Sequence, residues 1–210
     1  MEKYVLEKMT SMEHSKDIID RTLGSATVPE LVDQMKTFLF AGHDTTAIII
    51  SWIFYFLAEH PDILLRVRKE LDEVFGVNTT PSQVAEQIIS APKLHTKLKF
   101  TLACIKESLR LEPPASPVRQ STPGYSFTTS SNITFSPPEE CLIYISTYLL
   151  HRDPNVWGED ADEFKPDRFM KKEYTLSSYM PFSRRPRDCI GNALALLEVV
   201  HVLCGSLTID

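Results

Sequence analysis

The sequence predicts a mostly α-helical protein with a small β region, organised as a single domain over residues 1–210. Two observations lead to this fold class. Several long segments repeat apolar residues every three or four positions and begin or end at proline or glycine, which is typical of amphipathic helices. Residues 115–148 instead place prolines, serines and threonines between short apolar runs, which indicates short strands and turns.

The first well-marked helix is expected to run from near Pro29 to about His60. Proline suits a first helical turn, and Pro61 disfavours helical geometry in the residue before it. The second half of this helix, residues 48–57, is apolar on every side. A membrane span is one interpretation, but the uncharged run after Asp44 is too short to cross a bilayer. We therefore expect a helix that passes through the middle of a core.

Three more helices are expected further along the chain. Residues 61–75 form an amphipathic helix that Gly76 ends, and residues 96–111 form another that two prolines end. A mostly apolar run from Asn192 indicates a buried helix. The helix over 61–75 is expected to carry two ion pairs between residues four apart, Arg66 with Glu70 and Arg68 with Asp72.

The remaining segments predict shorter elements. Residues 1–26 are expected to hold one helix and a loop, and residues 77–92 a loop and a short helix. Within the β region, strands are expected over residues 131–135 and 142–146.

Composition excludes several classes of function. The net charge of −6, from 22 basic and 28 acidic residues, gives no basis for nucleic-acid binding. The four cysteines form no C-x-x-C pair, which argues against a zinc site or a disulfide framework and favours a reducing, intracellular setting. The first eight residues are too charged for a signal peptide or a membrane anchor.

One cysteine stands out by its position. Cys189 lies in an irregular loop just before the apolar helix that begins at Asn192, and three arginines precede it. The unpaired N–H groups and the dipole at a helix start favour the thiolate, which is the form that binds metals. An inert, half-buried cysteine is the alternative for any lone cysteine, and only the spacing of the neighbouring residues argues against it.

Two other groups of polar residues require an explanation. Residues 41–46 place glycine, aspartate and two threonines inside an apolar helix, where these residue types are poor choices, so they form either a satisfied kink or a functional site. Glu107 and Arg110 lie three apart and share a helix face. Taken alone, such a pair is a solvated surface contact worth roughly a few tenths of a kcal/mol.

In chain order, these motifs resemble those of the cytochrome P-450 monooxygenases. The haem-binding loop of that family is matched at Phe182, Arg187, Cys189 and Gly191. The resemblance implies that Cys189 is the axial iron ligand, that Arg187 pairs with a haem propionate and that Phe182 packs beside the thiolate. The family has glycine where this chain has Arg185, so we expect either a strained arginine or a loop that bends differently.

Residues 41–46 resemble the oxygen-activation motif of the same family at every position. The resemblance implies that Asp44 and Thr45 relay protons to dioxygen, and that the helix opens beside the haem at Ala41 and Gly42.

The pair Glu107 and Arg110 resembles the Glu-x-x-Arg signature of the family, and Arg168 lies in a stretch similar to its Pro-x-Arg-Phe motif. The resemblance implies a buried network of these three charges that supports the haem loop. It also implies that Arg119 binds a second propionate and that residues 115–118 line the substrate pocket.

The resemblance implies a truncated cytochrome P-450 fold: residues 1–210 as a single partial catalytic domain with the central helix, the Glu-x-x-Arg helix and the cysteine loop. The N-terminal anchor, the distal helices and the C-terminal sheet of the family are expected to be absent from this chain. A full-length relative would be attached to the endoplasmic reticulum membrane.

The implied function is a haem-thiolate monooxygenase with iron protoporphyrin IX as cofactor, inserting one oxygen atom from O2 into a small apolar organic substrate, with secondary metabolism as a setting. Its electrons would come from an NADPH-dependent reductase. One alternative is a truncated, non-catalytic remnant that binds haem weakly or not at all. Another, a haem-thiolate isomerase or dehydratase without O2, is disfavoured by the intact pair Asp44 and Thr45.

Overall fold

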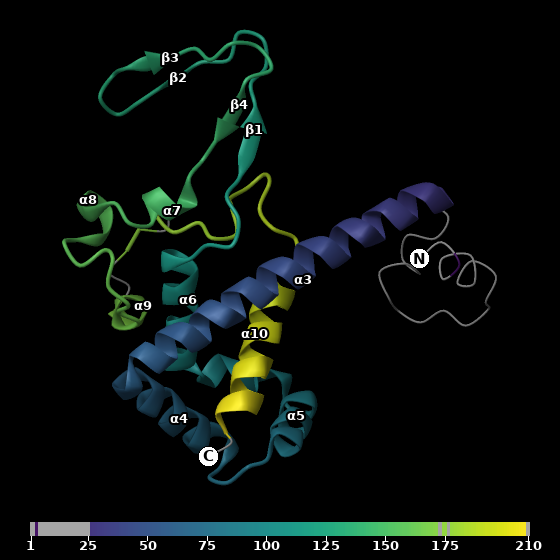
Figure 1. Ribbon diagram of the computed structural model, residues 1–210, viewed down its shortest axis with the longest axis vertical. Helices are drawn as coiled ribbons and strands as arrows, with labels where there is room; N and C mark the ends of the chain where they lie inside the picture. Colours follow the sequence, from purple (N-terminus) through teal and green to yellow (C-terminus); the bar gives the residue numbers. More distant parts are fainter. Residues whose placement is uncertain (1–2, 4–25, 172–173, 176, 209–210) are drawn as a thin grey trace. The chain divides into compact units, whose positions relative to one another are not determined.

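The computed structural model describes residue 3 and residues 26–171, 174–175 and 177–208. The helix and loop expected within residues 1–26 therefore fall almost entirely outside the described residues. The chain divides into two compact units, residues 1–47 and residues 48–210. The described residues are mostly helical and carry two small antiparallel sheets (Figure 1), which confirms the predicted fold class.

Prolines and one glycine set the bounds of the two longest elements at the start of the described chain. α3 spans Val28–Glu59 and α4 spans Pro61–Phe75, as the sequence predicted. α4 ends at Gly76, which has a φ of 97°, a left-handed conformation that glycine adopts without a steric penalty. α3 continues without a break through residues 41–46, so the polar cluster does not interrupt the helix.

The region between α4 and the β strands holds three helical elements. α5 spans Pro81–Ser90 and starts with a capping box, in which Thr80 and Gln83 satisfy each other's backbone N–H groups. The helix expected over residues 96–111 begins slightly later: α6 spans Lys99–Leu111, and a 3₁₀ helix, η1, spans Pro92–Lys97 before it.

Glu70 of α4 caps α6 from outside that helix. Its two carboxylate oxygens accept hydrogen bonds from the backbone N–H groups of Phe100 and Thr101, each at 2.7 Å, and from the Thr101 hydroxyl at 2.7 Å. A carboxylate at this position satisfies otherwise unpaired N–H groups and opposes the positive end of the helix dipole. The expected pair between Arg66 and Glu70 is therefore wrong, because Arg66 instead binds Asp167 through two hydrogen bonds of 2.9 Å.

Replacing Glu70 by alanine is expected to lower the free energy of unfolding by about 1–2 kcal/mol, the upper range for loss of a helix cap. The physical reason is that two backbone N–H groups of α6 lose their acceptor at once. Urea unfolding measures this change. Glu73→Ala serves as the matched control, because Glu73 is an exposed residue of the same helix. Equal midpoints for the two variants would contradict the capping role.

The β region forms two separate ribbons. β1 (Val118–Gln120) pairs antiparallel with β4 (Leu142–Tyr144), and β2 (Phe127–Thr128) pairs antiparallel with β3 (Thr134–Phe135). Both expected strands exist but are shorter than predicted. The second one ends early because Ser146 is the N-cap of the next helix, where its hydroxyl accepts the backbone N–H of Leu149 at 3.3 Å.

Four helices complete the described chain. α7 (Thr147–Leu150), α8 (Pro154–Trp157) and α9 (Asp167–Lys171) are short, and α10 (Asn192–Leu207) is the apolar helix expected from Asn192. Within the second unit, α10 packs against α5 and α6, and α6 packs against α4 and α9 (Figure 1). α6 is thus the central helix of this unit, and nearly all of its residues are buried.

The main hydrophobic core lies among these helices. α3 contributes Ile49, Ile53 and Leu57, each at most 4% exposed, and α10 contributes Val199 and Leu203. The expectation of a core helix therefore holds for one stripe of α3. The opposite face is not covered by the described chain, since Tyr55 is 52% exposed.

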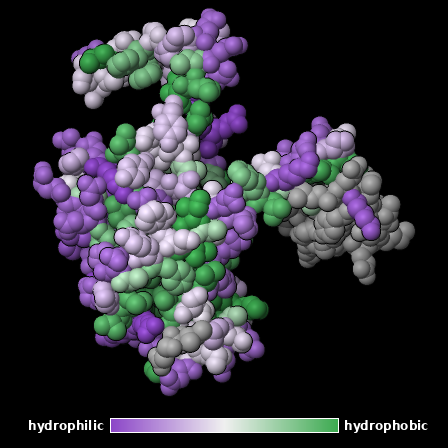
Figure 2. All heavy atoms as spheres, in the orientation of Figure 1, coloured by the Kyte–Doolittle hydropathy of each residue, from purple (hydrophilic) through white to green (hydrophobic). Residues whose placement is uncertain are grey.

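By length and composition α3 is also able to cross a membrane, as some core helices of soluble proteins are. Figure 2 shows further apolar side chains at the surface, on the hairpin of β2 and β3. They include Phe127, Ile133 and Phe135, which are 42–55% exposed. Phe127 and Phe135 stack across the ribbon with ring centroids 5.4 Å apart.

Candidate functional site

The loop that precedes α10 presents the thiol of Cys189. The backbone N–H of Cys189 donates to the carbonyl oxygen of Phe182 at 2.9 Å, which closes the loop at its base. The side chain of Phe182 is half-buried and packs against the main core. Cys189 itself is exposed. The loop is therefore fixed at one end to the core while the sulfur remains accessible.

Gly191 lies between this thiol and α10. It is the N-cap residue of α10, with φ −85° and ψ 1°, so its backbone does not require glycine. A Cβ atom at position 191 would lie 3.7 Å from the Cys189 Sγ atom, which is ordinary van der Waals contact. The structure thus joins the Phe182 backbone to that of Cys189 and places Gly191 beside the Cys189 sulfur at the start of a helix.

The strain expected at Arg185 is not found. In this loop the described residue with a left-handed backbone is Ser183, with a φ of 62°, and Arg185 has no positive φ. The left-handed residue of this loop therefore lies two positions before the one at which the family has glycine. An Arg185→Gly substitution has no strained conformation to relieve, so we expect no gain from it by that route.

The two arginines predicted to bind the propionates have different surroundings. Arg119 of β1 reaches the cysteine loop, where its Nη2 atom donates to the Ser183 hydroxyl at 3.4 Å. Its Nη1 atom donates to the Val118 carbonyl at 2.8 Å. Arg187 is exposed, and its guanidinium forms no hydrogen bond or ion pair with another described residue. Arg119 and the loop are therefore neighbours, and Arg187 lies within the loop with its charge facing solvent.

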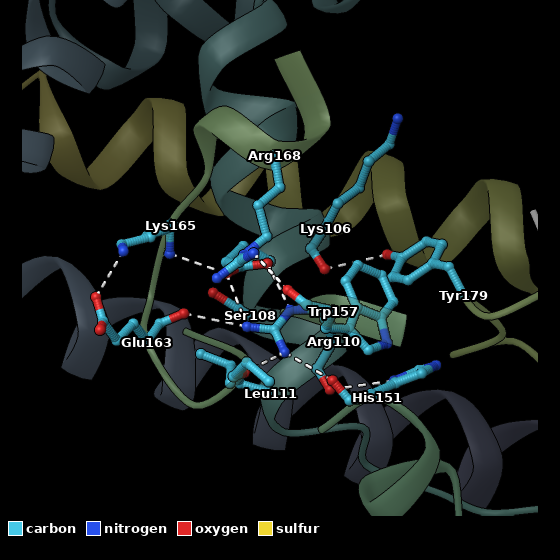
Figure 3. Close-up of polar contacts among 12 residues, drawn as sticks. Lys106, Ser108, Arg110, Leu111, His151, Trp157, Glu163, Lys165, Arg168 and Tyr179 are labelled. Carbon is cyan, nitrogen blue, oxygen red and sulfur yellow. Dashed lines mark hydrogen bonds and ion pairs between the residues drawn. The ribbon is translucent and has the colours of Figure 1, made fainter. Parts of the chain in front are cut away.

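Glu107, Arg110 and Arg168 meet in the interior of the second unit. Figure 3 shows the two arginines among their backbone partners. Glu107 and Arg110 lie one turn apart on α6, and both side chains are 0% exposed. Two parallel hydrogen bonds of 2.8 and 2.9 Å join the guanidinium to the carboxylate. The interpretation as a solvated surface pair is therefore wrong for this protein.

The other hydrogen-bonding atoms of Glu107 and Arg110 also have partners. Arg110 donates to the backbone carbonyls of His151 at 2.7 Å, Ala161 at 2.5 Å and Glu163 at 3.1 Å. Glu107 accepts the backbone N–H of Lys165 at 2.8 Å. One ion pair on α6 thus holds the irregular chain from residue 151 to residue 165 in place.

Arg168 adds a third charge to this network. Its Nε atom lies 3.4 Å from a carboxylate oxygen of Glu107, and its Nη1 atom donates to the carbonyl of Trp157 at 2.9 Å. Its Nη2 atom pairs with Asp160 at 2.7 Å, and the hydrogen bonds from Lys165 and Arg168 lower the pKa of Asp160 to about 2. The negative charges of two carboxylates therefore balance the positive charges of two guanidinium groups. They belong to Glu107, Asp160, Arg110 and Arg168.

His151 is part of the same region, and the sequence analysis assigned it no role. Its side chain is 0% exposed and lies between α6 and the segment that leads to the cysteine loop. Its Nδ1 atom is 3.1 Å from the Arg110 carbonyl oxygen, and its Nε2 atom accepts the backbone N–H of Met180 at 3.0 Å. Only the position of a histidine directly after an apolar run pointed to burial.

Acidification is expected to reduce stability through His151. Burial, aided by the charges of Arg110 and Arg152, lowers the pKa of His151 from 6.5 to about 4. The unfolded chain therefore binds a proton at a higher pH than the folded chain, and stability is lost as pH falls from about 6.5 towards about 4. The loss between pH 7 and pH 5 is about 2 kcal/mol from this group.

Urea midpoints of the wild type and of His151→Gln at pH 7 and pH 5 measure this contribution. Glutamine does not titrate, so the variant is expected to lose less stability than the wild type over the same interval. An equal loss of stability in both proteins would contradict the assignment of this pH dependence to His151.

The polar residues 41–46 of α3 belong to the first unit. The Thr45 hydroxyl donates to the carbonyl of Ala41 at 2.6 Å, the bond to the preceding turn that threonine commonly makes within helices. An oxygen of Asp44 lies 3.0 Å from Nδ1 of His43, and Ala41 and Gly42 are exposed. A Cβ atom on Gly42 would have no neighbour within 4 Å. The helix is therefore closed at Ala41 and Gly42, not opened as the resemblance implied.

The donor atoms limit what this site is able to bind. The described residues contain no cluster of three or more His, Cys, Asp or Glu side chains that could hold a metal ion. An iron centre that takes a single protein ligand is compatible with this arrangement, because a macrocycle supplies the other donors. Cys189 offers one accessible sulfur, and Arg119 and Arg187 offer cations for carboxylates.

Comparison with known proteins gives consistent matches. The family profile described as Cytochrome P450 matches residues 3–207. Over 175 residues the chain is 40% identical to the cytochrome P450 monooxygenase polC of Polytolypa hystricis, covering 81% of this chain and 31% of that protein. It is 36% identical over 174 residues to a cytokinin hydroxylase of Arabidopsis thaliana, covering 82% and 31%.

A putative cytochrome P450, CYP13A5 of Caenorhabditis elegans, is 33% identical over 205 residues, covering 94% of this chain and 37% of that protein. The chain spans about a third of the length of the curated relatives that it matches.

Proposed function

The chain belongs to the cytochrome P450 family, and on this basis we propose that it is the haem-ligating part of a monooxygenase domain that oxidises a small apolar organic molecule with O2. Proteins of this family depend on haem in general. The observation that carries the proposal is the accessible thiol of Cys189, held at the start of α10 by a loop whose base is closed on Phe182.

Cys189, Arg119 and Arg187 would hold the haem. The cysteine would supply the sulfur ligand of the iron, and the two arginines would pair with the propionate groups. When bound, haem supplies an iron centre for O2 chemistry, and a thiolate ligand favours cleavage of the O–O bond. Phe182 and Gly191 would flank the sulfur: the Phe182 carbonyl accepts the Cys189 backbone N–H, and a Cβ atom on Gly191 would lie 3.7 Å from the sulfur. Arg119 contributes a second function, because its contact with Ser183 connects the β1 strand to the loop.

Asp44 and Thr45 would handle protons. Asp44 is an exposed carboxylate that water can reach. The Thr45 hydroxyl carries a proton that it now donates to the Ala41 carbonyl at 2.6 Å, and rotation of that hydroxyl would free it to donate elsewhere. Ala41 and Gly42 would border the cofactor, because Ala41 carries only a methyl group and a Cβ atom on Gly42 would have no neighbour within 4 Å.

Glu107, Arg110 and Arg168 would act as structural support. Arg110 and Arg168 donate to backbone carbonyls over residues 151–163, and Glu107 binds Arg110 and the Lys165 N–H. His151 in turn contacts Met180, close to the base of the loop. We also propose that residues 1–210 belong to one catalytic domain, with α3 as its core helix, because Ile49, Ile53 and Leu57 pack in the main core. The free cysteines fit a reducing, intracellular setting, in which an NADPH-dependent reductase would supply electrons.

The test is the carbon-monoxide difference spectrum of the reduced, haem-loaded protein. The proposal predicts the strongly red-shifted main band that an intact thiolate ligand gives, followed by substrate oxidation that depends on O2 and a reductase. Absence of that band in a folded, haem-exposed sample would contradict the proposal and favour a non-catalytic protein.

A further inference from the structure

A single buried imidazole connects α6 to the segment that leads into the cysteine loop. The Nδ1 atom of His151 is 3.1 Å from the carbonyl oxygen of Arg110, and the backbone N–H of Met180 is 3.0 Å from its Nε2 atom. The ring also stacks on Tyr179, with centroids 5.6 Å apart and planes 25° apart. Both nitrogens of this histidine are therefore engaged by backbone groups from two distant parts of the chain.

The two partners determine the protonation state of the ring. A backbone N–H only donates, so Nε2 must carry no proton in order to accept from Met180. A carbonyl oxygen only accepts, so Nδ1 must carry the proton in order to bind Arg110. The bridge therefore requires a neutral imidazole with its proton on Nδ1, and an imidazolium would lose the bond to Met180.

The surroundings favour this neutral form. The charges that face the ring are the guanidinium groups of Arg110, from α6, and Arg152, from the turn after α7, and both disfavour a second proton. The groups packed on it from the other sides, the Tyr179 phenol and the Trp157 indole, are uncharged. Burial and the two cations lower the pKa of His151 to about 4.

A short stretch of backbone and one hydrogen bond connect His151 and Met180 to the loop that carries Cys189. Met180 lies two residues before Phe182, and the carbonyl of Phe182 accepts the backbone N–H of Cys189 at 2.9 Å. The Tyr179 hydroxyl, one residue before Met180, donates to the carbonyl of Lys106 on α6 at 3.2 Å. The base of the loop is thus attached to α6 by two routes, one directly from Tyr179 and one through the two hydrogen bonds of His151, and the second requires the unprotonated nitrogen of His151.

We propose that His151 is a positioning residue for the Cys189 loop: as a neutral imidazole it ties Met180 to the backbone of α6 and so fixes the direction in which the Cys189 sulfur is presented. The proposal rests on the proposed function, because the direction of the Cys189 sulfur matters only if that sulfur binds haem iron. The hydrogen-bonded bridge itself does not depend on haem.

The rival explanation is that His151 only fills space among Arg110, Trp157 and Tyr179. A phenylalanine at position 151 would fill nearly the same volume and stack on Tyr179, but it has no acceptor for Met180 and no donor for Arg110. Asparagine places a donor close to the Nδ1 position but does not reach Met180. Glutamine is longer and is able to place its oxygen close to the Nε2 position.

The first experiment uses the unaltered chain without haem. The ¹⁵N shifts and ¹H–¹⁵N correlations of its histidine rings identify the tautomer of each. The proposal predicts for His151 a neutral ring with the proton on Nδ1, unchanged from pH 8 to pH 5.5. A ring with the proton on Nε2, or an imidazolium at neutral pH, would overturn the proposal because neither accepts from Met180.

The second experiment compares His151→Phe, His151→Asn and His151→Gln by amide hydrogen exchange without haem. Loss of the bridge is expected to speed exchange at Met180 and Cys189 by about tenfold in the phenylalanine and asparagine variants, with partial rescue by glutamine. If the phenylalanine variant does not fold, the asparagine and glutamine pair decides the result. Wild-type protection at both amides in the asparagine variant would contradict the bridge.

A haem-loaded arm separates this proposal from the proposed function. Haem release is expected to be faster in the asparagine variant than in the glutamine variant. If the wild type itself gives no thiolate spectrum, the proposed function fails while the exchange data still decide the role of His151. If the exchange rates change as expected but haem release is equal in all variants, the bridge exists and its role in positioning Cys189 is refuted.

Discussion

Replacing Glu107 by alanine is expected to lower the free energy of unfolding by about 3–5 kcal/mol, because it leaves the guanidinium of Arg110 charged and buried without its counter-ion. Both side chains are fully buried, and the variant loses two hydrogen bonds to Arg110 and the acceptor for the Lys165 N–H. Since small domains are stable by only about 5–15 kcal/mol, the variant is expected to be partly unfolded at 37 °C. Urea unfolding followed by circular dichroism measures the change.

The matched control is Glu163→Ala. The side chain of Glu163 is 62% exposed and pairs with Lys165 at 2.8 Å, whereas its contact with Arg110 comes from the backbone and survives the substitution. An exposed pair of this kind is worth at most about 1 kcal/mol. The two variants therefore remove a carboxylate from the same region at very different depths. Similar losses of stability in both would show that the buried pair does not support the fold.

The predictable part of the fold is the part that local chemistry determines. Pro29 and Pro61 bound α3 and Gly76 ends α4, because proline and glycine restrict or free the backbone at their own positions. Strand lengths were less predictable. The second predicted strand is shortened by Ser146, whose side chain caps a helix that the sequence pattern did not reveal.

Ion pairs show where local reasoning fails. The spacing of Arg66 and Glu70 suggested a pair worth a few tenths of a kcal/mol, which is too weak to resist better partners. Arg66 instead forms two bonds with Asp167, which lies 101 residues away, and Glu70 forms three with Phe100 and Thr101. Contacts at that separation depend on how α4, α6 and α9 pack, which no local pattern states.

In the candidate site, too, local sequence predicts some features while others depend on packing between distant parts of the chain. Phe182, Cys189 and Gly191 come together because they are close in sequence, and Glu107 meets Arg110 because they share a helix face. The depth of that pair could not be read from its spacing, since α6 is buried by helices elsewhere in the chain. His151 was missed because its two partners are backbone groups, which leave no trace in residue identities.

Replacing Cys189 by serine is expected to abolish the thiolate haem spectrum and to leave the fold nearly unchanged. A serine hydroxyl stays protonated at neutral pH and offers iron a hard oxygen in place of a soft, electron-rich sulfur. Cys189 is exposed, and the hydrogen bond from its backbone to Phe182 does not depend on its side chain. The change in unfolding free energy is therefore expected to stay within about 0.5 kcal/mol.

Cys141→Ser is the control, because Cys141 is also a free cysteine outside the core, on the chain that enters β4. Its sulfur makes only a weak contact, 3.7 Å from the Leu142 carbonyl oxygen. The carbon-monoxide difference spectrum of each reduced, haem-loaded variant is compared with that of the wild type. The band is expected to vanish in the Cys189 variant alone, because only that sulfur stands at the helix start beside Gly191. A band that survives there would assign the iron ligand to another residue and remove the basis of the proposed function.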